Sequence, residues 1–211
     1  GGNQRWHAAG TLTAGQFDAG NGRIALLSDT GDILDTARTD TTGEDLADAT
    51  AAQVLVQAAG SLGTPGPGGN AFEIDTPTFA ATADDGMIVR ALSAVAIDTA
   101  NVTVQRVQTD GTTTPATETA EGLTATGTAP IVLRTSHGTI TVSATPSTRS
   151  ENAVQTGGGN VRIEAGIDDQ TGEASDLLVT SPIAPQGGHL TLLASGDITL
   201  QTPIATGGGT L

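Results

Sequence analysis

The sequence predicts an all-β chain that winds as a parallel β-solenoid, with about 21 residues per coil and loops inserted at the corners. Three observations support this fold class. A block near the C-terminus is repeated, apolar and polar residues alternate within it, and the chain has too little aromatic volume for a broad core.

The repeated block sets the length of one coil. Residues Gly187–Leu192 repeat Gly158–Ile163, and Asp197–Ala205 repeat Asp176–Ala184. The second pair gives a period of about 21 residues, which is too short for a globular domain and fits one coil of a stacked array. The first pair lies farther apart, and the extra residues fall in Gly166–Glu173, which we interpret as a loop inserted at a corner.

Alternation within the repeat predicts short strands with one buried face. Polar Arg162, Thr191 and Thr199 each stand between two apolar residues and should face solvent. The residues expected to point into the interior are Val161, Ile163, Ile183, Leu190, Leu192, Ile198, Leu200 and Ile204.

Parallel stacking of these strands makes specific pairs. Strands one coil apart should place Val161 beside Leu190 and Leu190 beside Leu211. If Leu200 lies in the interior, its replacement with Ala should cost about 2–5 kcal/mol.

The same pattern extends toward the N-terminus with less regularity. Stretches Thr36–Thr50, Gly63–Asn70 and Thr109–Pro130 are rich in Thr, Asp, Gly and Pro and are interpreted as corners and lateral loops. Residues 1–211 should therefore form a single solenoid segment of roughly seven to nine coils, part of a longer repetitive chain. The expected strands are Arg23–Leu27, Asp32–Leu34, Gln53–Gln57, Met87–Arg90, Val95–Ile97, Val102–Gln105, Ile131–Arg134 and Thr139–Val142.

Composition agrees with a narrow apolar interior. The chain has 29 Gly, three Phe, one Trp and no Cys or Tyr, so stacked aliphatic residues must fill its core. A net charge of −15 with eight basic residues argues against a nucleic-acid partner. No apolar run is long enough to insert into a membrane as a helix.

Several segments resemble giant bacterial surface proteins related to filamentous haemagglutinin. The resemblance is carried by Val54–Gly63, Asp75–Thr82 and Asp85–Val89, with Gly196–Leu200 and Gly207–Leu211 similar to the same family's coil. It implies a right-handed parallel β-helix, exported to the bacterial cell surface and used as an adhesin or structural fibre. Host or cell-surface carbohydrate is then a possible partner.

We expect no catalytic residues. The adjacent acidic pairs Glu44-Asp45, Asp84-Asp85 and Asp168-Asp169 lie in turns near Gly, where they favour turn formation over convergence on a substrate. The three histidines, His7, His137 and His189, are far apart in sequence. His189 occupies the repeat position of Asn160 and Thr210, which indicates a corner residue.

No cofactor is expected either, and calcium is the only one considered. Its weak candidate ligands are Asp168, Asp169 and Glu173 in one corner and Asp84 and Asp85 in another. The chain lacks the loop of an EF-hand and any Gly-Gly-x-Gly-x-Asp run, so solvated acidic turns are the simpler interpretation.

The ends of the stack are the expected sites of assembly. A coil without a neighbour exposes unpaired N–H and C=O groups, which favour pairing with another strand. We expect further coils of the same chain, or identical subunits, to stack there. The expected contacts are Gln4, Arg5, Trp6, His7, Gly207, Gly208, Gly209 and Leu211.

Two other function classes fit an all-β chain. A carbohydrate-active β-helix enzyme of the polysaccharide lyase or glycosidase type would need carboxylates and arginine converging on one exposed face. A string of Ig-like β-sandwich adhesion modules would repeat at about a hundred residues instead of about 21.

Overall fold

The computed structural model describes residues 2–36, 46–66, 69–145, 152–166, 172 and 174–211. These residues form strands and no helix, and hence no helix that could cross a bilayer. The strands are β1 (Gln4–Ala8), β2 (Leu12–Ala14), β3 (Phe17–Asp18), β4 (Arg23–Ser28), β5 (Ile33–Asp35), β6 (Ala49–Thr50), β7 (Gln53–Ala58), β8 (Phe72–Asp75), β9 (Thr78–Ala83), β10 (Met87–Ala91), β11 (Val95–Ile97), β12 (Thr99–Val107), β13 (Thr113–Glu121), β14 (Leu123–Ala125), β15 (Ile131–Thr135), β16 (Ile140–Val142), β17 (Val154–Thr156), β18 (Val161–Ala165), β19 (Leu177–Val179), β20 (Ile183–Ala184), β21 (Leu190–Ala194) and β22 (Ile198–Leu200).

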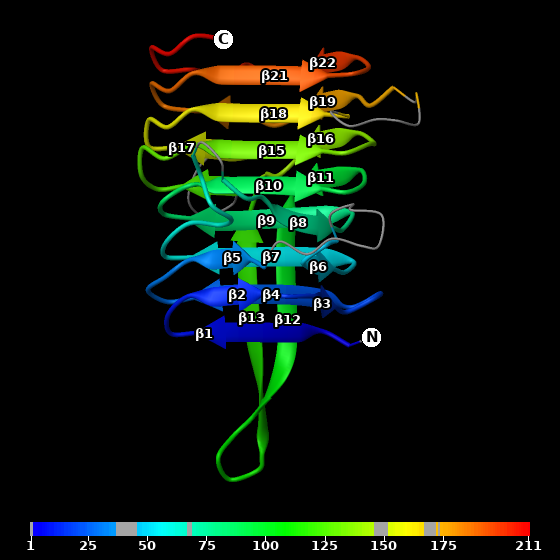
Figure 1. The fold of residues 1–211 in the computed structure, drawn as a ribbon, viewed down its shortest axis with the longest axis vertical. Helices are drawn as coiled ribbons and strands as arrows, with labels where there is room; N and C mark the ends of the chain where they lie inside the picture. The colour runs from blue at the N-terminus through cyan, green and yellow to red at the C-terminus, as the bar shows by residue number, and fades with distance from the viewer. Residues whose placement is uncertain (1, 37–45, 67–68, 146–151, 167–171, 173) are drawn as a thin grey trace.

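The strands stack in chain order along the long axis of the molecule (Figure 1). An eleven-stranded sheet contains the path β1-β4-β7-β9-β11-β16-β19-β22, and a seven-stranded sheet runs β21-β18-β15-β10-β8-β6-β3. Every pair in these two sheets is parallel, which is consistent with a β-solenoid and excludes the antiparallel sheets of an Ig-like sandwich. We call the strands at one level of this stack a rung.

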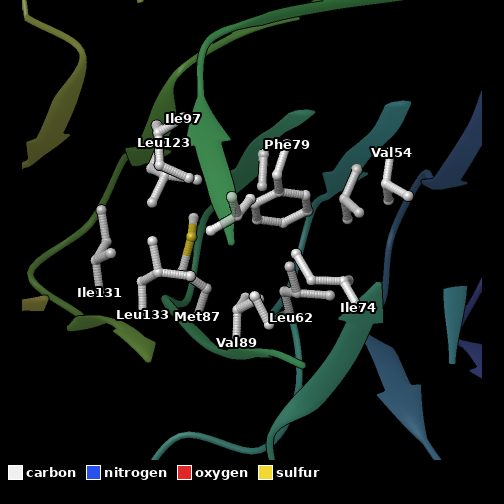
Figure 2. Close-up of a cluster of buried hydrophobic side chains, with 14 of the residues drawn as sticks. Val54, Leu62, Ile74, Phe79, Met87, Val89, Ile97, Leu123, Ile131 and Leu133 are labelled. Carbon is white, nitrogen blue, oxygen red and sulfur yellow. The ribbon is translucent and has the colours of Figure 1, made fainter. Parts of the chain in front are cut away.

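One apolar core runs between the sheets. Inward side chains of successive rungs lie against one another, as Figure 2 shows for Val54, Phe79 and Ile97 from one sheet facing Ile74 and Val89 from the other. The large side chains at the centre of this core are fully buried. Aliphatic stacking therefore replaces the aromatic volume that the composition lacks.

The predicted strand facing is confirmed in the repeat. Val161, Ile163, Leu190 and Ile183 are buried, whereas Arg162, Thr191 and Thr199 are exposed. Val161 pairs with Leu190 in parallel register. Val161 N donates to His189 O, the residue before its partner Leu190. Leu190 N donates in the same way to Thr210 O at 2.9 Å, so Leu211 lies beside Leu190 as expected.

The last rung departs from the expected burial. Leu200 pairs with Val179 and shares its inward facing, but its side chain is 46% exposed because no described residue lies beyond it. Ile198 is exposed for the same reason, and Leu192 and Ile204 are only partly buried against the core. The expected cost of Leu200→Ala was therefore too high, since water already reaches about half of the site.

Rung length varies more than the C-terminal repeat indicates. Leu177 pairs with Ile198 at the expected period, but Gln4 pairs with Ile24 after a slightly shorter interval, and Val95 with Ile140 after more than twice that length. The longest interval contains a β-hairpin formed by β12 and β13. The interpretation of Thr109–Pro130 as a loop was wrong, because β13 and β14 lie within it. Thr-rich stretches form strands readily when a partner strand is available.

The hairpin packs on the outside of the stack and runs back toward the N-terminal end (Figure 1). Ala100, Val102 and Ala120 from the hairpin form a second buried cluster with outward residues of β4, β7 and β9. This contact explains why β4 is apolar on both faces, with Ala25 and Leu27 pointing outward. The distal part of the hairpin extends past β1, and Val107 there is largely exposed.

Candidate assembly site at the ends of the stack

Both ends of the larger sheet present an open strand edge. Among the described residues, β1 pairs with β4 alone and β22 with β19 alone. The outer N–H and C=O groups of these strands therefore have no strand partner within the described part of the chain. Such edges pair readily with another strand.

An apolar column joins the two ends through every rung. Each member pairs in parallel with the next, so the side chains stack directly on one another. The column consists of Leu12, Ile33, Leu62, Met87, Ile131, Val161, Leu190 and Leu211. Its interior members are buried, while Leu12 is half-buried and Leu211 is 76% exposed.

A second column fixes the register of the other sheet in the same way. It consists of Gln4, Ile24, Val54, Phe79, Ile97, Val142, Val179 and Leu200. One end is the polar Gln4 and the other is the exposed Leu200. A rung placed on β1 in continuous register would thus bring a residue equivalent to Leu200 onto Gln4.

Trp6 covers the interior at the N-terminal end. It pairs with inward-facing Leu26, and its ring lies 5.0 Å from that of Phe17 between centroids. Its indole N–H donates to Gln4 Oε1 at 3.2 Å. Trp6 is 45% exposed, so this end is only partly closed. The position is compatible with a terminal packing residue and with a contact to a neighbouring subunit.

An open groove lies between β1 and the overhanging hairpin. Arg5 and His7 face it from β1, and the whole lining is Asn3, Arg5, Trp6, His7, Val104, Gln105 and Arg106. Arg5 Nε is held by Glu118 Oε1 of the hairpin at 2.7 Å, and His7 Nε2 lies 2.7 Å from Asp29 Oδ1. The hairpin is therefore tied to the first rung at the point where it leaves the stack.

The glycines predicted to contact a neighbour form a tight turn at the other end. Gly207 and Gly208 have φ values of 65° and 113°, which favour glycine. Gly209 lies so close to the carbonyl of Gly188 that a Cβ would overlap it, and Gly188 stands in the same relation to Gly159. These turns stack backbone against backbone, and Leu211 follows the last of them.

The residues predicted as calcium ligands lie in two corners, of which the structure describes one. Asp84 and Asp85 lie exposed in the turn between β9 and β10, where Asp84 Oδ1 accepts a hydrogen bond from Thr126 at 2.7 Å. Asp168, Asp169 and Glu173 lie outside the described residues. Asp84 and Asp85 do not belong to the acidic group that could hold a metal ion among the described residues.

That group consists of Asp35, Asp48 and Glu73. Asp48 lies in the stretch Thr36–Thr50, which was interpreted from the sequence as a corner or lateral loop, and no role was predicted for Asp35 or Glu73. The available signal was Glu73, which interrupts the apolar strand Phe72–Ile74 and is itself buried. A buried carboxylate between two core residues requires a specific partner.

Two arginines converge on one carboxylate on an outer sheet face. Glu164 in β18 is approached by Arg134 Nε at 3.3 Å and Arg162 Nη2 at 2.8 Å. Both arginines are partly exposed, and the pairing runs across and along neighbouring strands. This arrangement matches a charge ladder on a parallel sheet.

The histidines do not converge. His189 Nδ1 lies 2.7 Å from Thr210 Oγ1, and its backbone N–H donates to Asn160 Oδ1 at 2.9 Å. The three residues that share this repeat position thus form a polar ladder at one corner.

Comparison with protein-family models, with curated proteins and with solved structures finds no match for this chain.

Proposed function

We propose that this chain is a segment of a right-handed parallel β-helix with a structural or adhesive role in an extracellular bacterial surface protein or fibre. The observation that supports the role most directly is the column from Leu12 to Leu211, which crosses every rung and ends in exposed leucine. A stack whose apolar interior is continuous to both faces accepts a further rung at either end. Further coils of the same chain and identical subunits would bury the exposed end of this column equally well.

For the isolated chain of 211 residues, we propose that a second copy of the chain supplies the further rung at the end of the stack. Head-to-tail stacking would set Leu211 on Leu12 and Leu200 on Gln4 of the next copy, since these residues end the same two columns. Such heterologous contacts do not close on themselves and generate filaments. The distal hairpin, with exposed Val107, would lie along the side of the incoming rung.

The role is proposed as non-catalytic. Asp84 and Asp85 lie together in a turn, and Glu164 is engaged by two arginines, so these carboxylates serve turns and strand pairing. A glycosidase would require two carboxylates facing each other across a substrate at about 5–9 Å. Binding of cell-surface carbohydrate remains part of the proposal for an adhesive role.

Sedimentation velocity tests the stacking. Leu211→Asp places a charge on the exposed end of the apolar column and should abolish association, because the carboxylate would be buried without a partner. Leu193→Asp is the matched control: Leu193 lies in the neighbouring strand β21, is also exposed, and pairs with Glu164 on the outer face. It should associate as the unmodified chain does.

The only tryptophan gives a second readout of the same event. Trp6 lies at the end that the incoming rung would cover, so its emission should shift to shorter wavelength as protein concentration rises. A chain that stays monomeric at all concentrations, with unchanged Trp6 emission, would contradict stacking between copies.

A further inference from the structure

Three carboxylates meet between the second and third rungs. Asp35 ends β5, Asp48 directly precedes β6, and Glu73 lies in β8, which pairs with β6 in parallel. One oxygen atom from each carboxylate lies within 4.8 Å of the other two. Asp48 is 0% exposed and Glu73 is 4% exposed, so water has little access to two members of the group.

Backbone hydrogen bonds hold Asp48 in place. Its N–H donates to Glu73 O at 2.8 Å, and its carbonyl oxygen accepts from Phe17 N at 2.7 Å. Glu73 N in turn donates to Asp48 Oδ2 at 3.0 Å. Nearby, the Asn70 side-chain amide donates to Asp35 Oδ2. The carboxylates of Asp48 and Asp35 are thus oriented by a backbone N–H and a side-chain amide.

The other carboxylate oxygen of Asp48, Oδ1, lacks the hydrogen bond that a buried oxygen normally has. Oδ1 is buried and has no hydrogen-bond partner among the described residues. Buried polar atoms are nearly always satisfied, and an unsatisfied carboxylate oxygen is costly. The surroundings of Oδ1 therefore favour a proton or a cation.

We propose that Asp35, Asp48 and Glu73 bind one calcium ion. The ligands are all oxygen atoms, which select hard cations such as Ca²⁺ and Mg²⁺ over transition metals. Ca²⁺ fits better, because it accepts carboxylates in irregular geometry, whereas Mg²⁺ resists the dehydration that a buried Asp48 requires. This site is independent of the proposed stacking.

The ion would act as a structural cross-link. It would join the end of β5 and the start of β6 to β8 of the next rung, and so tie together strands from two neighbouring rungs. Binding to the folded chain alone raises the stability of that chain by mass action.

Calorimetry of the full 211-residue chain, stripped with a chelator and titrated with CaCl₂, tests the proposal. We expect one Ca²⁺ per chain, weaker binding of Mg²⁺, and a higher thermal unfolding midpoint in CaCl₂ than in chelator. Asp48→Asn should remove both the binding and the midpoint shift. Asp84→Asn removes an exposed carboxylate in another turn and should retain them.

Two results would overturn the site. If Ca²⁺ does not bind the unmodified chain, the three carboxylates are not a calcium site. A higher unfolding midpoint for Asp48→Asn in chelator would then indicate that Asp48 is satisfied by a shared proton. If Asp84→Asn weakens binding as much as Asp48→Asn, the ion binds the acidic surface in general. If Asp48→Asn does not fold, Asp35→Asn is the second variant, because Asp35 is only half-buried. It should likewise lose Ca²⁺ binding and the shift of the unfolding midpoint.

Discussion

Phe79→Ala should destabilise the chain by about 3–5 kcal/mol, because it empties a fully buried site in the core. Phe79 pairs with Val54 in β7 and Ile97 in β11, so its ring lies between the rungs on both sides (Figure 2). Both neighbours are held by ladder hydrogen bonds, and the site cannot collapse onto the cavity. Chemical denaturation followed by circular dichroism would measure the loss.

Leu200→Ala is the control for this effect. Leu200 belongs to the same column as Phe79 but lies in the last rung and is 46% exposed. Its truncation should cost about 1 kcal/mol, since only part of the side chain leaves an apolar environment. Equal costs at the two positions would contradict the assignment of the column's interior and end.

Gly159→Ala should also be strongly destabilising, by about 3 kcal/mol, through overlap of backbone with the new methyl group. A Cβ at Gly159 would lie inside the van der Waals surface of the Ala129 carbonyl in the preceding rung. Neither atom belongs to a flexible side chain, so two rungs would have to separate at this corner. The same denaturation experiment measures the change.

Gly10→Ala is the matched substitution at an open position. Its Cβ would meet no atom within 4 Å, and its backbone angles suit any residue. We expect stability within about 0.5 kcal/mol of the unmodified chain. A similarly small change at Gly159 would mean that the rungs are not stacked as closely as the structure has them.

Local pattern was enough to predict most of the strands. Val95–Ile97 was predicted with the bounds that the structure has, and Gln53–Gln57 differs from β7 by one residue. Strand period and β-branched composition are contained within a few residues, so they need no tertiary information. The pairing of Val161 with Leu190 was predictable because the repeat aligns them directly.

The hairpin and the acidic group depend on contacts that the repeat does not encode. Asp110-Gly111 is a turn signal between Thr-rich runs, and Gly111 does have a φ of 81°, but the run was interpreted as a loop. Asp48 and Glu73 meet because β6 pairs with β8 in parallel, with Ala49 beside Ile74. Irregular insertions leave the register of those rungs undetermined by sequence alone.

Disulfide cross-linking tests the proposed head-to-tail contact most directly, because the chain contains no Cys. Opposed Cα atoms in neighbouring strands lie about 4.8 Å apart, within the range that a disulfide spans. Under oxidising conditions, the double variant Leu12→Cys/Leu211→Cys should give a ladder of covalent oligomers on a non-reducing gel, and Leu12→Cys/Leu193→Cys should not. Absence of the ladder, or an equal one from the second pair, would contradict end-to-end stacking through the apolar column.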